Sequence, residues 1–387
     1  MAAALLCILL AACGGGSPAP QAAVTDAGSG AAPAGQPQAT SPSDSPPAAG
    51  ESSAISASGD AAAQDDVPEG ADARFNRPIG LARDNIGNLF VADAGNHTIR
   101  KITPAGVVTT VAGAAGVSGS NDGVGPAARF SALKGLAVDG TGNIYAVDNS
   151  AIRKVTPTGV VSTLAGIPGE LGDSDGPGSS ARFRRPWGIA VDAASNVYVA
   201  DTENRLVRRI TPAGNVVTHA GTRGMRGTAD GSTASATFLG PAGIATDSSG
   251  NLYLTDWYGP PAPNIPERST FIRRIGTDGT VSTMAGSYNT FSAPAPFLDT
   301  FAIAADREGN VYVAARNSVQ RISTTGTITT VAGPVAQFQS LEGIAIDDAG
   351  NLYVTDTPSH TIHKVSPGGE VTTVAGKALE PGSRNAP

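Results

Sequence analysis

Few side chains of this 387-residue chain could do chemistry, and most of them stand at positions that recur along the sequence. An Asp closes an apolar run five times, at Asp93, Asp148, Asp201, Asp256 and Asp356. A ring of carboxylates around an axis could bind a cation or a basic ligand. Alternatively, each Asp caps its own turn and pairs with an Arg a few residues later, as Arg208 follows Asp201. Because the Asp recurs so regularly, the structural role is favoured.

Aromatic and basic residues at two irregular places are better candidates for contact with a ligand. Trp257 and Tyr258 open a proline-rich insertion, WYGPPAPNIPERSTF, that lengthens one repeat by ten residues. Exposed aromatic side chains are costly without a packing partner or a ligand. Arg184, Arg185 and Trp187 lead into an apolar run and could flank the same opening. We therefore predict one binding face, which comprises Trp257, Tyr258, Arg184, Arg185, Trp187, Asp201, Asp256, His97 and His360.

Metal and enzymatic chemistry are less well supported. Zinc sites use about three protein ligands, and the chain has only four histidines, of which His97 and His360 share one turn position in different repeats. Asp173-Ser174-Asp175-Gly176 suggests a calcium loop, but Arg184 stands where a bidentate Glu is needed. A tight Asp-Gly turn is the simpler interpretation. We predict no metal and no cofactor, and we leave catalytic activity open, leaning against it.

The elements that position these residues come from six copies of one phrase. The first reads GNLFVADAGNHTIRKITPAGVVTTVAG from Gly87 to Gly113, and later copies begin at residues 142, 195, 250, 309 and 350. Each copy, with the apolar run before it, contains four segments rich in β-branched residues and bounded by Gly, Asn-Gly or Asp-Gly turns, which is typical of strands. Repeats of this kind bury their apolar faces by stacking on their neighbours. The pattern predicts an all-β, six-bladed β-propeller with four antiparallel strands per blade.

The repeats resemble NHL repeats, a propeller family named for an Asn-His-Leu-like tripeptide after the second strand. Asn96-His97-Thr98, Asn204-Arg205-Leu206 and Ser359-His360-Thr361 stand at that position. The resemblance covers residues 72 to 376 and implies a propeller. It implies no single function, because the family includes protein-binding and RNA-binding scaffolds, lyases and sensor domains.

The connections between repeats also recur. Asp122-Gly123, Asp175-Gly176 and Asp230-Gly231 each begin nine residues after the preceding Ala-Gly, and we expect tight turns there within three long loops. Neither end of the chain offers an obvious strand to the other end's sheet. We therefore expect the ring to close by packing of the first blade on the sixth, and this junction to be the weakest.

The N-terminal region differs from the repeats in composition. Residues 1–12 resemble a secretory signal, and Leu10-Ala11-Ala12-Cys13 resembles the bacterial lipobox, in which the Cys is lipidated. Residues 13–66 contain no Lys or Arg and no apolar periodicity, so we expect a disordered tether after Cys13. The propeller then spans 67–376, and residues 377–387 form a C-terminal tail.

These features favour a binding scaffold for a protein, peptide or glycan at a bacterial cell envelope, at the outer membrane or the periplasmic face. The protein would be monomeric and would touch the membrane only through its lipid. The alternative, implied by six-bladed propellers that are enzymes, is an exported metal-dependent lyase or lactonase. Nucleic acid is disfavoured, because the tether holds six of the acids behind the net charge of −7 and the remainder is nearly neutral.

Overall fold

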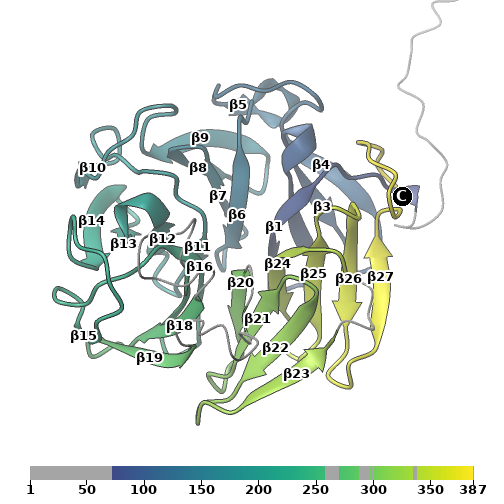
Figure 1. Cartoon of the computed structure of the whole chain (residues 1–387). Helices are drawn as coiled ribbons and strands as arrows, with labels where there is room; N and C mark the ends of the chain where they lie inside the picture. Colours follow the sequence, from purple (N-terminus) through teal and green to yellow (C-terminus); the bar gives the residue numbers. More distant parts are fainter. Residues whose placement is uncertain (1–71, 258–269, 287–296, 298–299, 334–337, 387) are drawn as a thin grey trace, which may run out of the picture. The chain divides into compact units, whose positions relative to one another are not determined.

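A computed structural model describes residues 72–257, 270–286, 297, 300–333 and 338–386. The predicted signal, Cys13, the tether and Tyr258 lie outside the described residues. Six antiparallel sheets surround a common axis, which confirms the predicted six-bladed propeller (Figure 1). No helix in the described ranges combines the length and apolar character needed to cross a membrane.

Blades 1 to 3 contain the following strands and short 3₁₀ helices. Blade 1 has β1 (Pro78–Arg83), β2 (Leu89–Asp93), η2 (Ala94–Asn96), β3 (Thr98–Ile102) and β4 (Val108–Ala112). Blade 2 has β5 (Gly123–Val124), η3 (Gly125–Ala127), β6 (Leu133–Val138), β7 (Ile144–Asp148), β8 (Ala151–Val155) and β9 (Val160–Ala165). Blade 3 has β10 (Gly176–Pro177), β11 (Ile189–Val191), β12 (Val197–Asp201), η4 (Thr202–Asn204), β13 (Leu206–Ile210) and β14 (Asn215–Ala220).

Blades 4 to 6 repeat the same order. Blade 4 has β15 (Gly231–Ser232), β16 (Pro241–Thr246), β17 (Leu252–Trp257), β18 (Thr270–Ile275) and β19 (Thr280–Gly286). Blade 5 has β20 (Thr300–Ala305), β21 (Val311–Ala315), β22 (Ser318–Ile322) and β23 (Ile328–Ala332). Blade 6 has β24 (Leu341–Ile346), β25 (Leu352–Asp356), β26 (Thr361–Val365) and β27 (Val371–Ala375).

The apolar core lies between neighbouring blades. Ala92 and Ile99 of blade 1, for example, share a cluster with Leu133 and Ile144 of blade 2, and Phe130 of the connecting loop belongs to the same cluster. Equivalent clusters fill the later junctions. Each blade therefore buries its apolar surface only by stacking on its neighbours, as the repeats predicted.

Three blades have five strands where four were predicted. The Asp-Gly pairs do not form simple turns, because each Gly begins a short strand at the outer edge of the next blade. Gly123 pairs with Val161, Gly176 with Val216 and Gly231 with Val281. Each long loop therefore runs to the outer edge of the next blade, adds a two-residue strand to the sheet there, and returns to the axis.

The ends of the chain correct the expectation that packing alone closes the ring. Residues after β27 cross to blade 1, where Val108 and Ala386 exchange backbone hydrogen bonds of 2.6 and 3.2 Å. Figure 1 shows the C-terminal end beside blade 1. The amide of Gly382 donates to the carbonyl oxygen of Phe75 at 3.0 Å. The tail therefore supplies the edge of blade 1, as the long loops do for blades 2 to 4.

Glycines bring the inner strands close together around the axis. Gly80, Gly135, Gly188, Gly243 and Gly343 occupy one position of the inner strand, and blade 5 has Ala302 there. A Cβ on Gly135 would lie 2.8 Å from the carbonyl oxygen of Trp187 in the next blade. None of these glycines has a positive φ, so lack of space explains the choice of residue.

This packing yields a prediction for stability. The Gly135→Ala variant should lose about 1–3 kcal/mol of unfolding free energy, because its methyl group would force two inner strands apart. Urea unfolding measures the loss. Gly140→Ala is the matched control in the same blade, since a Cβ there meets no atom within 4 Å. Equal stabilities of the two variants would contradict a tightly packed axis.

Candidate functional site

The residue before each axial glycine, or before Ala302 in blade 5, differs from blade to blade. These six residues are Ile79, Lys134, Trp187, Ala242, Phe301 and Glu342. We call the end of the axis that they surround the axial mouth. A cavity of about 80 Å³ lies there, lined among others by Trp187, Phe301 and Glu342. The repeated strands thus provide a uniform scaffold whose variable side chains meet at one point, as expected of a binding site.

Three aromatic rings form a continuous cluster at the axial mouth. Trp187 stacks on Phe301 with ring centres 5.0 Å apart and an interplanar angle of 28°. Trp257 meets Phe301 edge to face at 5.1 Å. The ammonium of Lys134 lies 4.1 Å from the ring centre of Trp187, within the range of a cation–π interaction. The cluster joins blades 2 to 5.

Two opposite charges at the axial mouth do not form an ion pair with each other. Burial lowers the pKa of Lys134, with Glu342 acting in the opposite direction and Arg77 and Arg185 adding to the decrease. Burial raises the pKa of Glu342, while Lys134 and Arg77 act to lower it. Among the described residues, neither the ammonium nor the carboxylate has a hydrogen-bond partner. Within this part of the chain, both groups keep hydrogen-bonding capacity that a ligand can use.

The sequence-predicted residues fall into two groups, and the first lies at or beside the axial mouth. Trp187 and Trp257 belong to the aromatic cluster, and Arg184 and Arg185 are exposed next to it. Arg185 contacts Glu203 at 3.0 Å in an exposed ion pair.

The two predicted histidines occupy the turns between the second and third strands. His97 and His360 both have left-handed backbones, with φ of 59° and 61°. The amide of Arg77 donates to Nδ1 of His360 at 3.0 Å and links blade 1 to blade 6. His360 thus supports the backbone from which Arg77 extends.

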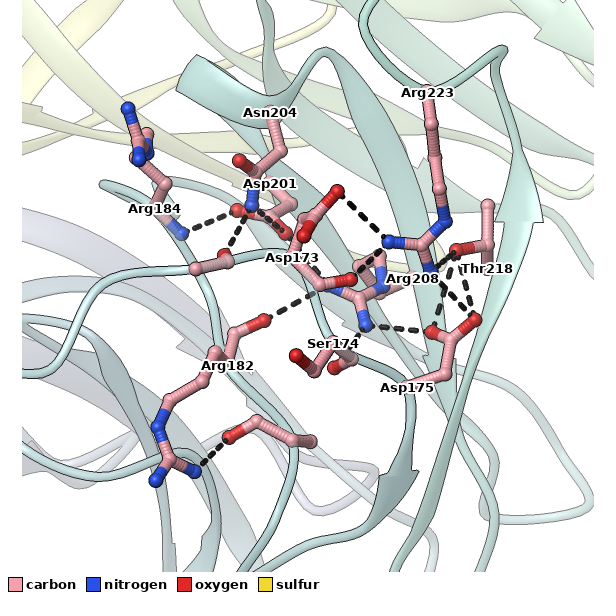
Figure 2. A network of polar contacts seen from close by, with 12 residues as sticks. Asp173, Ser174, Asp175, Arg182, Arg184, Asp201, Asn204, Arg208, Thr218 and Arg223 are labelled. Atoms are coloured by element: carbon pink, nitrogen blue, oxygen red, sulfur yellow. Dashed lines mark hydrogen bonds and ion pairs between the residues drawn. The ribbon is translucent and has the colours of Figure 1, made fainter.

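Asp201 and Asp256 belong to the second group, which is fully buried and does not face a ligand. In blade 3, Arg208 of β13 contacts Asp201 at 2.9 Å and Asp175 at 2.6 Å (Figure 2). The same guanidinium donates to the carbonyl oxygens of Arg182 and Ser174 at 3.0 and 2.8 Å. We call this arrangement the arginine clamp. Its equivalents in the other blades are Asp93–Arg100, Asp148–Arg153 and Asp256–Arg273.

The arginine clamp explains why the Asp recurs. Asp201 also accepts hydrogen bonds from the amide of Arg184 at 2.8 Å and from Nδ2 of Asn204 at 2.8 Å, so its carboxylate is saturated. Burial raises the pKa of Asp201 to about 6, although these hydrogen bonds and Arg208 act to lower it. The structural alternative is therefore confirmed for the four Asp residues that pair with an Arg. Asp356 of blade 6 is also structural, but it accepts hydrogen bonds from backbone amides and from the hydroxyl of Ser359 instead.

The loop considered for calcium belongs to the same network. Asp175 also contacts Arg223 at 2.7 Å, and Asp173 contacts Arg223 at 3.0 Å (Figure 2). Arginines thus supply the positive charge that a cation would bring. No group of three or more His, Cys, Asp or Glu in the described ranges is arranged to hold a metal ion.

A larger cavity, of about 1120 Å³, lies among the hairpin turns that join the first and second strands of blades 3 to 6. Its aspartates already serve their own hairpins. Asp247, for example, accepts hydrogen bonds from Nδ2 of Asn251 at 2.7 Å and from the hydroxyl of Tyr253 at 2.9 Å. Nearly the same turn recurs in every blade. These turns are therefore a weaker candidate for a specific binding site than the variable residues of the axial mouth.

Four residues of the axial mouth were missed by the sequence reasoning: Lys134, Phe301, Glu342 and Arg77. For Lys134, Phe301 and Glu342 a signal was available, because aligning the six repeats shows one variable position before the axial glycine. Arg77 stands three residues before Gly80 and is outside that position. The prediction rested instead on the insertion after Trp257, of which residues 258–269 lie outside the described ranges.

The fold and the axial mouth define a six-bladed β-propeller with a variable surface at one end of its axis. Three segments, residues 75–102, 183–210 and 338–365, match the model for the NHL repeat and fall in blades 1, 3 and 6. The chain is therefore a six-bladed propeller that contains NHL repeats, and the predicted resemblance is confirmed.

Similar proteins have diverse functions. Teneurin-3 of Danio rerio is 32% identical over 168 residues, which cover 40% of this chain but only 6% of that protein. An auxiliary nutrient binding protein of Bacteroides thetaiotaomicron has a TM-score of 0.53 at 12% identity and covers 78% of this chain and 70% of its own. A streptogramin B lyase has a TM-score of 0.51 at 15% identity and covers 82% and 88%. At these identities the two structures support the fold alone.

Proposed function

We propose that this propeller is a binding scaffold whose axial mouth engages a protein or peptide partner. The main support is that the variable residues of six otherwise similar blades meet on one small surface. Trp187 and Trp257 belong to it, and tryptophan is among the residues that dominate binding energy at protein interfaces.

The size of the axial cavity favours a macromolecular partner over a small ligand. Small-molecule pockets usually have about 300–1,000 Å³, whereas the cavity at the axial mouth has about 80 Å³. Such a cavity accepts one side chain or one chain terminus, while the rest of the partner lies on the surrounding surface.

The cell-envelope location is part of the proposal and is supported by the sequence alone. Cys13 in its lipobox-like context would carry the lipid, and the following residues up to position 66 would connect the propeller to the membrane. As a flexible coil this tether would reach roughly 40 Å. That distance would allow the propeller to search for a partner close to the membrane surface.

The alternative is a metal-dependent lyase or lactonase, and a streptogramin B lyase is among the proteins with a similar fold. Such an enzyme would need several His, Asp or Glu side chains directed at one ion. The axial mouth instead combines aromatic rings with one Lys and one Glu. We therefore favour a binding function over a catalytic one.

Capture of partners from bacterial envelope extracts tests the proposal. The Trp187→Ala variant should weaken binding of specific partners about 30-fold or more, because a central interface tryptophan is removed. Ile86→Ala is the matched control, since Ile86 is exposed at the opposite end of blade 1. The proposal fails if both variants retain the same partners as the wild-type protein. Thermal unfolding of each variant checks that the fold is intact.

A further inference from the structure

The charges at the axial mouth indicate what kind of partner binds there. This inference rests on the proposed function. We propose that the partner is an acidic peptide segment and that one of its carboxylates binds at the axial mouth beside Lys134, Arg77 and Arg185.

The three cations come from the start of the inner strands of three successive blades. Arg77 precedes β1, Lys134 lies in β6, and Arg185 precedes β11. The inner strands of these blades lie close together, since the amide of Gly135 donates to the carbonyl oxygen of Trp187 at 3.0 Å and a Cβ on Gly80 would meet the carbonyl oxygen of Lys134. Lys134 therefore lies between the strands that Arg77 and Arg185 precede, and in keeping with this position both act to lower its pKa. Like charges gathered in this way are stabilised when an anion binds between them.

The surrounding anions do not saturate these cations. Glu342 influences Lys134 electrostatically but makes no hydrogen bond to it among the described residues. Arg185 is paired with Glu203, but both side chains are largely exposed, and an exposed pair of this kind is readily exchanged for another partner. Counted over the residues that the structure describes, the axial mouth therefore keeps positive charge that no hydrogen-bonded acid within it balances.

The shape of the axial mouth favours a peptide over other anions. Nucleic acid binds along extended tracks of positive charge, whereas these cations form one compact group. Sugars stack on open aromatic faces, but Trp187 and Phe301 stack on each other. A peptide with a carboxylate next to an apolar side chain matches this site, because the carboxylate would contact Lys134 and the apolar side chain would contact the adjoining aromatic cluster.

Glu342 should make the binding depend on pH. The charged groups that act on it are Lys134 and Arg77, and burial raises its pKa. As the pH falls from 7 toward this raised pKa, Glu342 loses its negative charge and no longer repels the bound carboxylate. Affinity for an acidic peptide should therefore increase on acidification, as long as the peptide itself stays ionised.

Isothermal titration calorimetry on the full chain at low salt tests the inference. The probe is the end-blocked peptide Glu-Glu-Phe-Glu-Glu, with Gln-Gln-Phe-Gln-Gln as the neutral counterpart. We expect the acidic peptide to bind at least about tenfold more tightly, and Lys134→Gln to weaken it about tenfold, because a charge-assisted contact is lost. Arg307→Gln is the charge-matched control, since Arg307 is exposed in a hairpin turn at the opposite end of the axis.

Glu342→Gln and a nucleic-acid probe complete the test. Glu342→Gln should bind the acidic peptide more tightly at pH 7 and lose the gain that the wild-type protein shows on acidification. Equal binding of the two peptides, an unchanged Lys134→Gln variant, or tighter binding of a single-stranded oligonucleotide would each overturn the inference. The inference about an acidic peptide and the proposed binding function can fail independently. If the peptide test fails but Trp187→Ala still loses its captured partners, the binding function stands. If Trp187→Ala keeps those partners, the binding function is wrong.

Discussion

Replacing Arg208 with alanine is expected to lower the unfolding free energy by about 3–5 kcal/mol. The guanidinium is fully buried, and its removal would leave the carboxylate of Asp201 buried without its counter-charge. It would also leave the carbonyl oxygens of Arg182 and Ser174 without their donor. Denaturant unfolding of the variant and the wild-type protein at pH 7 measures the difference.

Arg185→Ala in the same blade is the matched control for this prediction. It also removes an Arg that contacts an acidic side chain, but this pair is exposed and should contribute no more than about 1 kcal/mol. Similar losses in both variants would show that the arginine clamp is not an important source of stability. Asp175→Asn should have an intermediate effect, because Asp175 lies partly in solvent.

Deleting residues 377–387 is expected to destabilise the propeller by about 3–6 kcal/mol, since several buried hydrogen bonds would be lost together. Arg100 would lose the carbonyl oxygen of Arg384 and the side-chain oxygen of Asn385, both at 2.8 Å. Val108 would lose its ladder partner Ala386. The thermal unfolding midpoint of the truncated chain, compared with that of the full chain, tests this expectation.

Asn385 offers a finer test of the same junction. It follows Gly376 by nine residues, the spacing at which Asp122 follows Gly113, and its side chain contacts Arg100 as Asp122 contacts Arg153. The tail is thus equivalent to the first half of a long loop. Asn385→Ala should cost about 1–2 kcal/mol, whereas Asn385→Asp should be neutral or stabilising. A tail deletion without effect would support closure by packing alone.

The arginine clamp gives both predictions one physical basis. In blades 1 to 4 a buried Arg joins the end of the second strand to a segment that arrives from the preceding blade or from the tail. Blade 5 has Ala315 and Gln320 at these positions, and blade 6 has His363 in place of the Arg. We therefore expect the clamp to stabilise mainly blades 1 to 4.

The architecture could be predicted from the amino-acid sequence alone, because the information lies in local patterns that recur. Alternating β-branched residues and Gly turns specify each strand, and six repeats that cannot bury their faces alone specify the ring. The pairing of the recurring Asp with an Arg of its own blade in blades 1 to 4 was also accessible, since both residues stand at nearly fixed spacing in adjacent strands.

Contacts between residues far apart in the sequence could not be predicted in this way and became visible in the folded chain. Lys134, Phe301 and Glu342 are far apart in the sequence and come together because the glycines draw six inner strands to one axis. Asn385 and Arg100 meet because the ring must close, and no local pattern encodes a contact between the two ends of a chain. Strand propensity is a property of neighbours along the chain, whereas a site on the axis depends on the geometry of the complete ring.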